Sequence, residues 1–235
     1  MNIKISTEIF AKFPLYRRGV VIAHGISNGP SPAALITNLR EAENALCMQL
    51  TPETIATHPK IASWREAYRS LGIKPSEFRP SMEALVRRVL KMEPLPSISR
   101  IVDLGNLVSI RNLIPIGAHA IDRLTTDMDL RLAAGDEIFE PFGSDIVDHP
   151  NPAEVIFAEG NTVLTRRWTW RQSKHTLILP ETTAVEFNVD ALPPVSDRDI
   201  EQIVSELAVL IQKYCGGNTR YGILSKDNPV VQLTC

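Results

Sequence analysis

Hydrophobic residues along the chain follow two different spacings. Over much of the first half, and again near the C-terminus, they recur every three or four residues, which is typical of amphipathic helices. This spacing predicts helices at residues 33–50, 60–71, from Pro80 and Ser81 onward, and 196–215. β-Branched or alternating runs predict strands at residues 1–6, 19–23, 154–158, 163–171 and around Val185, Phe187 and Val189. The elements together predict one α+β domain over residues 1–235, layered around a β-sandwich core with flanking helices.

Composition narrows the class of protein. Hydrophobic residues make up 44% and charged residues 22%, which is typical of a globular chain that needs no disulfide or metal to fold. The formal net charge is −2, so any surface that binds nucleic acid must be local. Cys47, Cys215 and Cys235 are scattered, which indicates a reducing compartment rather than a disulfide framework or a zinc site. With neither a signal-peptide pattern nor a membrane-spanning run, the sequence predicts a cytoplasmic protein that does not contact membranes.

The common catalytic signatures are missing. The sequence has no phosphate-binding loop, no dinucleotide fingerprint, no zinc-protease motif and no nucleophile elbow. The five histidines are far apart in sequence and do not show metal-ligand spacing. We therefore predict no metal and no cofactor.

A polar stripe interrupts the apolar segment at residues 101–112. A helix through this segment would align Asp103, Asn106 and Ser109 on one face. Side chains of this kind in an apolar context are partly buried and need hydrogen-bond partners. Two interpretations remain open, a polar network that holds a loop and the wall of a polar pocket.

Basic and aromatic residues alternate near residue 170. If residues 163–171 form a strand, Trp168 and Trp170 share one face, while Arg167, Thr169 and Arg171 share the other. Arginines next to aromatic rings suit RNA, because they bind phosphates and stack on bases. Core tryptophans beside ordinary solvated arginines would give the same pattern. The helix that begins at Pro80 is also basic on one face, with Arg87, Arg88 and Lys91.

Several motifs occur in the order of a known family. Val102-Asp103-x-x-Asn106-x-Val108, followed by Pro115 and His119-Ala120-Ile121-Asp122, resembles the "VVDVTNYV…GQPMHAFD" stretch of the B3/B4 domain of the phenylalanyl-tRNA synthetase β subunit. Pro80, Ser81, Leu85 and Arg88 resemble that family's "SP-x-W-L-x-x-R-L" helix, and Gln172-Ser173 with Glu181–Val185 resembles a strand region downstream. The series is similar still more closely to free-standing B3/B4 domain proteins. The resemblance covers about residues 10–215 and leaves residues 216–235 as a C-terminal tail.

The resemblance implies a specific activity. In the synthetase this domain holds the editing site, where tyrosine misattached to phenylalanine tRNA is hydrolysed. It therefore implies a trans-acting editing deacylase that binds the CCA end of aminoacylated tRNA and positions a water without a covalent nucleophile. Under this hypothesis the candidate catalytic residues are Asp103, Asn106 and His24, the last of which follows the predicted strand at residues 19–23. The candidate substrate-binding residues are Ser81, Ser109, Arg111, Asn112, Arg167, Arg171, Gln172 and Ser173.

One departure from the family bears on the substrate. The family has "L-E-L-G-Q-P" after the asparagine, and its glutamate is associated with the hydroxyl of misattached tyrosine. Residues 110–115 of this chain are two residues longer and lack a carboxylate, which predicts a substrate other than tyrosine. Two alternatives stay open: a non-catalytic module that binds tRNA or a free amino acid, and an enzyme acting on a small amino-acid-like ester or amide. The sequence does not indicate an oligomeric state.

Overall fold

Two β-sheets and a set of helices make up the computed structural model, which describes residues 1–144 and 146–233. One sheet has the strand order β3 (Ile116–Ala120), β8 (Ala184–Ala191), β2 (Arg17–His24) and β9 (Asn218–Leu224). The other has the order β10 (Val230–Gln232), β1 (Asn2–Ile5), β4 (Met128–Leu132), β5 (Val155–Glu159), β6 (Thr162–Arg166) and β7 (Arg171–Gln172). The helices in the described ranges are α1 (Thr7–Lys12), α2 (Ala33–Gln49), η1 (Ile55–Thr57, a 3-10 turn), α3 (Pro59–Ser70), α4 (Ser81–Leu90), α5 (Arg100–Asn112) and α6 (Asp197–Cys215).

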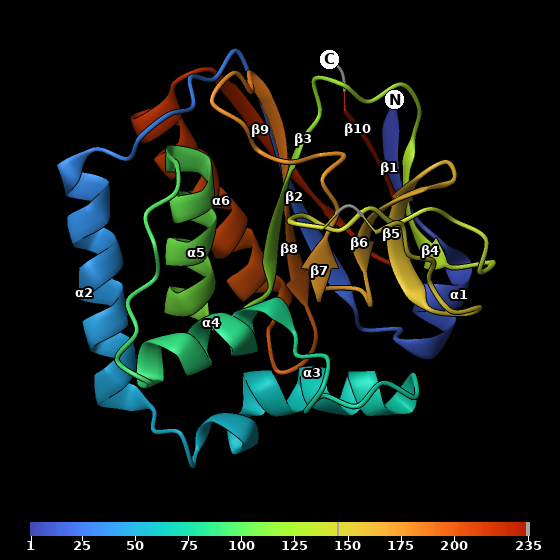
Figure 1. Ribbon diagram of the computed structural model, residues 1–235, viewed down its shortest axis with the longest axis horizontal. Helices are drawn as coiled ribbons and strands as arrows, with labels where there is room; N and C mark the ends of the chain where they lie inside the picture. Colours follow the sequence, from blue (N-terminus) through green and yellow to red (C-terminus); the bar gives the residue numbers. More distant parts are fainter. Residues whose placement is uncertain (145, 234–235) are drawn as a thin grey trace.

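The two faces of the four-stranded sheet have different neighbours (Figure 1). Helices α5 and α6 cover one face, where Phe187 lies close to Gly105 of α5 and Gly19 lies against Val204 of α6. The other face meets the six-stranded sheet, and the guanidinium of Arg18 lies 4.3 Å from the ring centroid of Phe157 in β5. The predicted α+β architecture, with a β-sandwich core and flanking helices, is confirmed.

Local signals explain where several helices begin and end. Ser196 and Asp199 form a reciprocal capping box at the start of α6, and Gly216 follows its last residue. Ser99 caps α5, which ends at Leu113 in the left-handed conformation. The predicted helices at 33–50, 60–71, from Ser81 and at 196–215 are all present.

The strand predicted over residues 163–171 is wrong in its second half. Strand β6 ends at Arg166, and the chain turns through Arg167 and Trp168, whose φ angles are 46° and 65°. The two tryptophans therefore do not share a strand face. Trp168 is buried within an aromatic cluster of Phe13, Tyr16 and Trp64, while Trp170 packs edge-on against Phe78. This packing, together with the bond from the amide of Trp168 to the carbonyl of Val155, outweighs the local preference for a strand.

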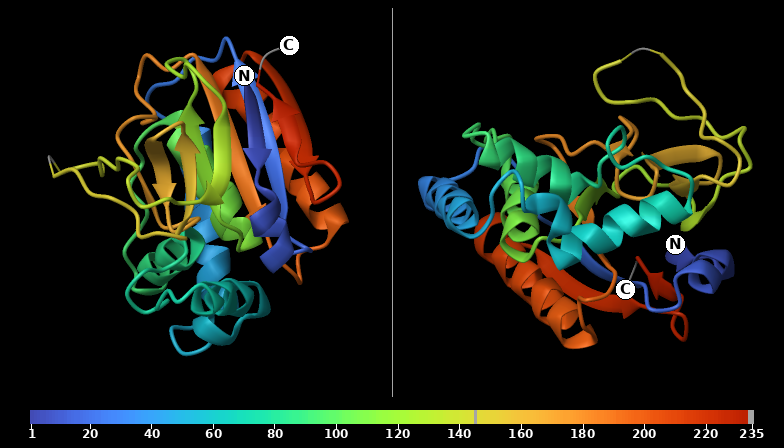
Figure 2. Two further views of the ribbon diagram at one scale, coloured as in Figure 1. Left: turned by 90° about the vertical axis from the view of Figure 1, so that its right-hand side faces the viewer. Right: turned by 90° about the horizontal axis from the view of Figure 1, so that it is seen from below.

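Much of the described part of the segment predicted as a C-terminal tail, residues 216–235, belongs to the sheets, in β9 and β10. Strand β9 pairs with β2, and β10 pairs antiparallel with β1, so the two ends of the described chain lie close together (Figure 2). Leu224 and Leu233 are buried in the main hydrophobic core. No helix in the described ranges is long and apolar enough to cross a bilayer.

Substitution of Gly19 tests the contact between α6 and the sheet. An added Cβ at Gly19 would lie 2.3 Å from Cγ1 of Val204, whereas at Gly222 the nearest atom would be 3.5 Å away. We expect Gly19→Ala to lower the free energy of unfolding by about 1–3 kcal/mol through overpacking, and Gly222→Ala to change it far less. Urea denaturation followed by tryptophan fluorescence measures both. Equal losses in the two variants would contradict the close packing of α6 on β2.

Candidate functional site

A cavity of about 110 Å³ lies where the edge strands of the two sheets, β3 and β7, come together. The N-terminus of α4 and the turn before β7 complete its wall. We call this cavity the β3–β7 pocket. It is lined by Ser81, Pro115, Ile116, Gly117, Thr165, Trp168, Thr169, Trp170, Arg171, Gln172, Asn188 and Asp190.

Strand β8 supplies the buried polar part of the pocket. Asp190 is fully buried and accepts hydrogen bonds from Nε of Arg18 at 2.9 Å and from the hydroxyl of Tyr16. Its second oxygen accepts from Nδ2 of Asn188 at 2.7 Å. Arg18 and Asp190 face each other directly across β2 and β8, so the antiparallel register brings the two charges together. The buried carboxylate is thereby compensated before any ligand binds.

Two polar groups of β8 keep unused hydrogen-bonding capacity. Oδ1 of Asn188 and both carboxyl oxygens of Glu186 are buried and have no hydrogen-bond partner among the described residues. A Cβ at Gly117 would lie only 2.6 Å from Oδ1 of Asn188, so the glycine allows the amide to approach β3. The pKa of Glu186 is raised to about 8: burial raises it most, the charge of Arg18 opposes this shift, and the charge of Asp190 adds to it. Glu186 is therefore largely neutral at pH 7.

A neutral histidine supports the opposite wall. His119 is buried, and burial together with the nearby Arg18 lowers its pKa to about 3. Its Nδ1 lies 2.7 Å from Oγ1 of Thr176, and its Nε2 lies 3.4 Å from Oγ1 of Thr165. Nε2 of Gln172, which can only donate, lies 3.3 Å from Nδ1 of His119 and 2.8 Å from the carbonyl of Ala118. These contacts orient the pocket-lining Thr165 and Gln172.

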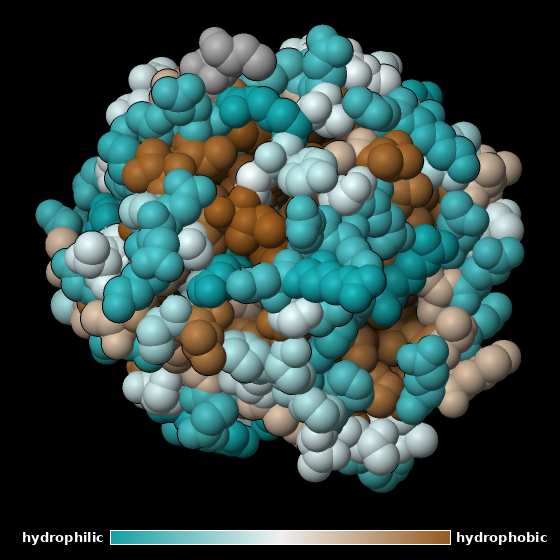
Figure 3. All heavy atoms as spheres, turned by 180° about the vertical axis from the view of Figure 1, so that it is seen from behind, coloured by the Kyte–Doolittle hydropathy of each residue, from teal (hydrophilic) through white to brown (hydrophobic). Residues whose placement is uncertain are grey.

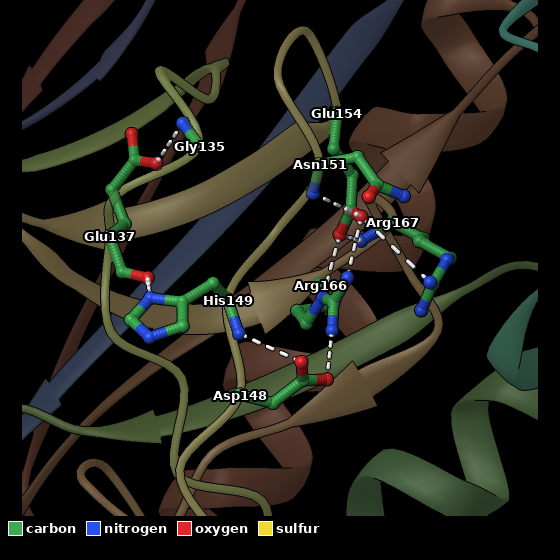
Figure 4. Close-up of polar contacts among 8 residues, drawn as sticks. All are labelled: Gly135, Glu137, Asp148, His149, Asn151, Glu154, Arg166 and Arg167. Atoms are coloured by element: carbon green, nitrogen blue, oxygen red, sulfur yellow. Dashed lines mark hydrogen bonds and ion pairs between the residues drawn. The ribbon is translucent and has the colours of Figure 1, made fainter.

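A buried ion network anchors the turn that forms the rest of the wall (Figure 4). The guanidinium of Arg166 donates to both oxygens of Glu154 at 2.9 and 2.8 Å, and it also pairs with Asp148. The same Glu154 accepts from the amide of Arg167 at 3.1 Å. The network holds the beginning of the 167–170 turn, where the backbone adopts its positive φ angles.

Part of the predicted substrate-binding set lies at this pocket. Ser81, Arg171 and Gln172 line it. Arg167 lies just outside, with its guanidinium 3.7 Å from the ring centroid of Phe78 and 4.5 Å from that of Trp170. Ser173 is fully buried next to Gln172.

The predicted residues of α5 lie elsewhere. Asp103 accepts hydrogen bonds from the hydroxyls of Ser31 and Ser97 at 2.6 Å and from the amide of Ile98 at 2.9 Å. Asp103 therefore holds a loop, which was one of the two open interpretations. The other predicted residues outside the pocket lining are Ser109 (bonded to the carbonyl of Ile114), Arg111 (3.4 Å from Glu206), Asn112 (bonded to the carbonyl of Val108) and the half-buried Asn106.

His24 is also remote from the pocket lining. It lies at the end of β2, and its Nε2 is 3.1 Å from the carbonyl oxygen of Leu233. The catalytic roles of His24, Asp103 and Asn106 stay predictions, since the structure does not bring them to the β3–β7 pocket.

Sequence reasoning missed the polar face of β8. Glu186, Asn188 and Asp190 occupy every second position between Val185, Phe187 and Val189. Only the apolar residues of this alternation were used to predict the strand. The three hydrogen-bonding side chains on the other face of the strand were the pattern that could have indicated a polar site. The second sheet that buries them could not be inferred from this strand alone.

Metal-binding side chains do not gather in the described part of the chain. No group of three or more His, Cys, Asp or Glu residues there could hold a metal ion. Cys47 is exposed and Cys215 is buried, both as free thiols, and Cys235 lies outside the described residues.

Comparison with known proteins assigns the family. A model of the B3/4 domain family matches residues 63–216, and the chain therefore belongs to this family, as its motifs predicted. Among solved structures it is similar to an N-terminal fragment of the phenylalanyl-tRNA synthetase β-subunit from Pyrococcus horikoshii, with 10% identity and a TM-score of 0.46. That match covers 93% of this chain and 50% of the other, so the chain spans about half the length of the fragment. A search of curated protein sequences found no match.

The neutral state of Glu186 gives stability a defined pH dependence. Its pKa is about 8 in the folded protein against an ordinary value of 4.5, so the folded state binds the proton more tightly. This contribution is complete below the unfolded pKa and is lost as the pH rises to about 8. Glu186→Gln imitates the neutral acid, so its advantage over the wild-type chain should grow between about pH 5 and 8, by at most ~1.4 kcal/mol per pH unit.

Urea unfolding at several pH values measures this difference. Glu181→Gln is a suitable control because it makes the same change of side chain at an exposed position. A constant difference between Glu186→Gln and the wild type at all pH values would contradict the raised pKa.

Proposed function

We propose that this protein is a cytoplasmic, trans-acting editing deacylase that hydrolyses the ester of misacylated tRNA in the β3–β7 pocket. The main support is a small pocket in a B3/4 domain, which is lined by both apolar and polar side chains and contains Asn188, whose buried amide oxygen is unpaired among the described residues. An unpaired buried acceptor is costly, and a donor on a bound ligand would relieve that cost. The ammonium group or a side-chain hydroxyl of an aminoacyl ester is such a donor.

The dimensions of the pocket favour a small, polar aminoacyl group. An apolar cavity of about 150 Å³ accommodates a benzene ring. The β3–β7 pocket is smaller, at about 110 Å³, and is lined by hydroxyl and amide groups of Ser81, Thr165, Gln172 and Asn188. This agrees with the missing carboxylate at residues 110–115, which had already argued against tyrosine. We therefore propose a small polar amino acid as the group removed.

Hydrolysis in this pocket would depend on positioning. A water must attack the ester carbonyl carbon while the 3′ oxygen of the terminal ribose leaves as a hydroxyl. The hydroxyl of Thr165, which His119 orients from behind, can hold this water, and Gln172 is fixed beside it. The neighbouring hydroxyl of the terminal ribose is a further donor on the substrate itself. Holding the reacting groups in this way is a recognised source of rate acceleration.

A deacylation assay tests the proposal. Purified protein is mixed with tRNAs that carry a panel of labelled amino acids, and release of each amino acid is followed over time. We expect release of small polar amino acids, and we expect Thr165→Val to lower kcat at least about tenfold while KM changes little. Thr162→Val on the same strand is the matched control, since Thr162 does not line the pocket.

Other outcomes separate the alternatives. Loss of release in Asn106→Ala, with Thr165→Val fully active, would move the site to α5, where the family resemblance first pointed. Tight tRNA binding without release of any amino acid would favour the non-catalytic binding module. Release from small amino-acid esters that is indifferent to tRNA would favour the third alternative.

A further inference from the structure

A groove along α4 is lined mainly by positively charged side chains. It encloses about 460 Å³ and is lined by Arg79, Arg87, Arg88 and Lys91, with Glu93 as its only acidic lining residue. These side chains give the lining a formal charge of +3 (four positive, one negative), while the whole chain carries −2. We call this surface the α4 groove. The face opposite to that of Figure 1 is mixed instead, with apolar patches separated by hydrophilic side chains (Figure 3).

Most of the positive charge in the α4 groove is uncompensated. Within the described ranges no carboxylate pairs with Arg79, Arg88 or Lys91, and Nε of Arg88 donates only to the backbone carbonyl of Pro94. Arg87 does pair with Glu83 at 2.8 Å. The same carboxylate oxygen of Glu83 also accepts from Arg65 at 2.7 Å, so two guanidinium groups share one negative charge.

Helix α4 reaches both the α4 groove and the β3–β7 pocket. Ser81, the first residue of α4, lines the pocket, and its amide donates to the carbonyl of Thr169 in the pocket wall at 2.9 Å. Arg79 precedes Ser81 by two residues, and Arg88 follows it by seven, which is about 10 Å along a helix. Helix α4 lies on the side of the molecule that faces the viewer in Figure 1, below α5. A chain that enters the pocket by its end can thus extend over the groove.

The groove rests on a fixed support. Met82, Val86 and Val89 anchor α4 in the main hydrophobic core, and Glu83 is fully buried beneath it. The cationic side chains therefore project from a helix whose position is set by packing. Such a surface can present several charges to a regularly spaced anion.

We infer that the α4 groove binds the phosphates of the tRNA acceptor arm whose aminoacylated end enters the β3–β7 pocket. This inference rests on the proposed function and extends it to the path of the RNA backbone. Each phosphate contact releases counterions, so it contributes affinity that falls with salt and carries little sequence preference. A local cationic surface of this kind accounts for RNA binding by a chain whose net charge is negative.

Charge reversal on α4 tests this path. Binding of uncharged tRNA is measured from about 50 to 300 mM KCl for the wild type and for the double variant Arg88→Glu, Lys91→Glu. We expect the variant to bind about tenfold or more weakly at low salt, with a slope of log K against log salt that is shallower by roughly 1–2. The control is Lys213→Glu, Lys226→Glu, which makes the same change in net charge at two exposed lysines near the end of α6 and in the β9–β10 turn.

The results of the tRNA-binding experiment can be distinguished from the results of the deacylation assay. Equal losses in the α4 variant and the control, or no tRNA binding by the wild type, would overturn the inference. So would binding to phosphatidylserine vesicles in place of tRNA, which would make the groove a membrane-facing surface. If the α4 variant loses tRNA affinity and the wild type releases no amino acid, the inference stands while the deacylase proposal fails. Thermal unfolding of both double variants controls for loss of the fold.

Discussion

The buried pair of Arg18 and Asp190 is the interaction on which the inner layer of this fold depends. The two residues are direct partners across β2 and β8, and both are almost completely inaccessible to solvent. Burial lowers the pKa of Arg18, but Asp190 and Tyr16 more than offset this effect, so its charge is retained. A shift of the strand pairing by one residue would place the two side chains on opposite faces of the sheet. Each charge would then be buried without its partner. The pair therefore specifies the alignment of the central strands more than it adds to stability.

The same pair determines the electrostatic character of the pocket. Arg18 is a positive charge near His119. Because Arg18 pairs with Asp190, it is only a weak counterion for Glu186. Burial is the main reason that the pKa of His119 is low and the pKa of Glu186 is high; Arg18 adds to the first shift and opposes the second. His119 therefore stays unprotonated, and Glu186 retains its proton near pH 7. Apart from the exposed Arg171, the polar groups that line the β3–β7 pocket are neutral donors and acceptors beside one compensated ion pair. Such surroundings recognise a polar group by hydrogen bonds, and they penalise a ligand that leaves the amide oxygen of Asn188 unpaired.

Sequence patterns were sufficient where local forces decide the structure, and insufficient where tertiary contacts do. The stripe and capping box of α6 are contained within one segment, and its limits were predicted closely. The turn at Arg167 and Trp168 requires unfavourable φ angles that only the surrounding aromatic cluster and Glu154 make tolerable, so propensity favoured a strand. The three-residue spacing of Asp103, Asn106 and Ser109 predicted which face of the helix Asp103 occupies. It did not predict that the hydroxyls of Ser31 and Ser97 would donate hydrogen bonds to Asp103. The buried polar residues of the candidate pocket, Asn188 and Asp190, come from β8. In the sequence, the polar face of this strand is typical of a solvent-exposed face, because the second sheet that covers it cannot be inferred from the strand alone.

The buried neutral groups of the β3–β7 pocket and the unpaired cations of the α4 groove lie in different parts of this molecule, and each set suits a different part of one substrate. A phosphate close to the pocket would meet the buried carboxylate of Asp190 and the dipoles around it, whereas on α4 it meets cations in water. Exposed cations bind through a long-range attraction that salt weakens, and they distinguish poorly between RNA sequences. Buried hydrogen-bonding groups act only at contact, and they discriminate strongly between ligands that satisfy them and ligands that do not. Helix α4 joins the two regions through Ser81, so the placement of that helix sets how far the backbone-binding surface lies from the pocket.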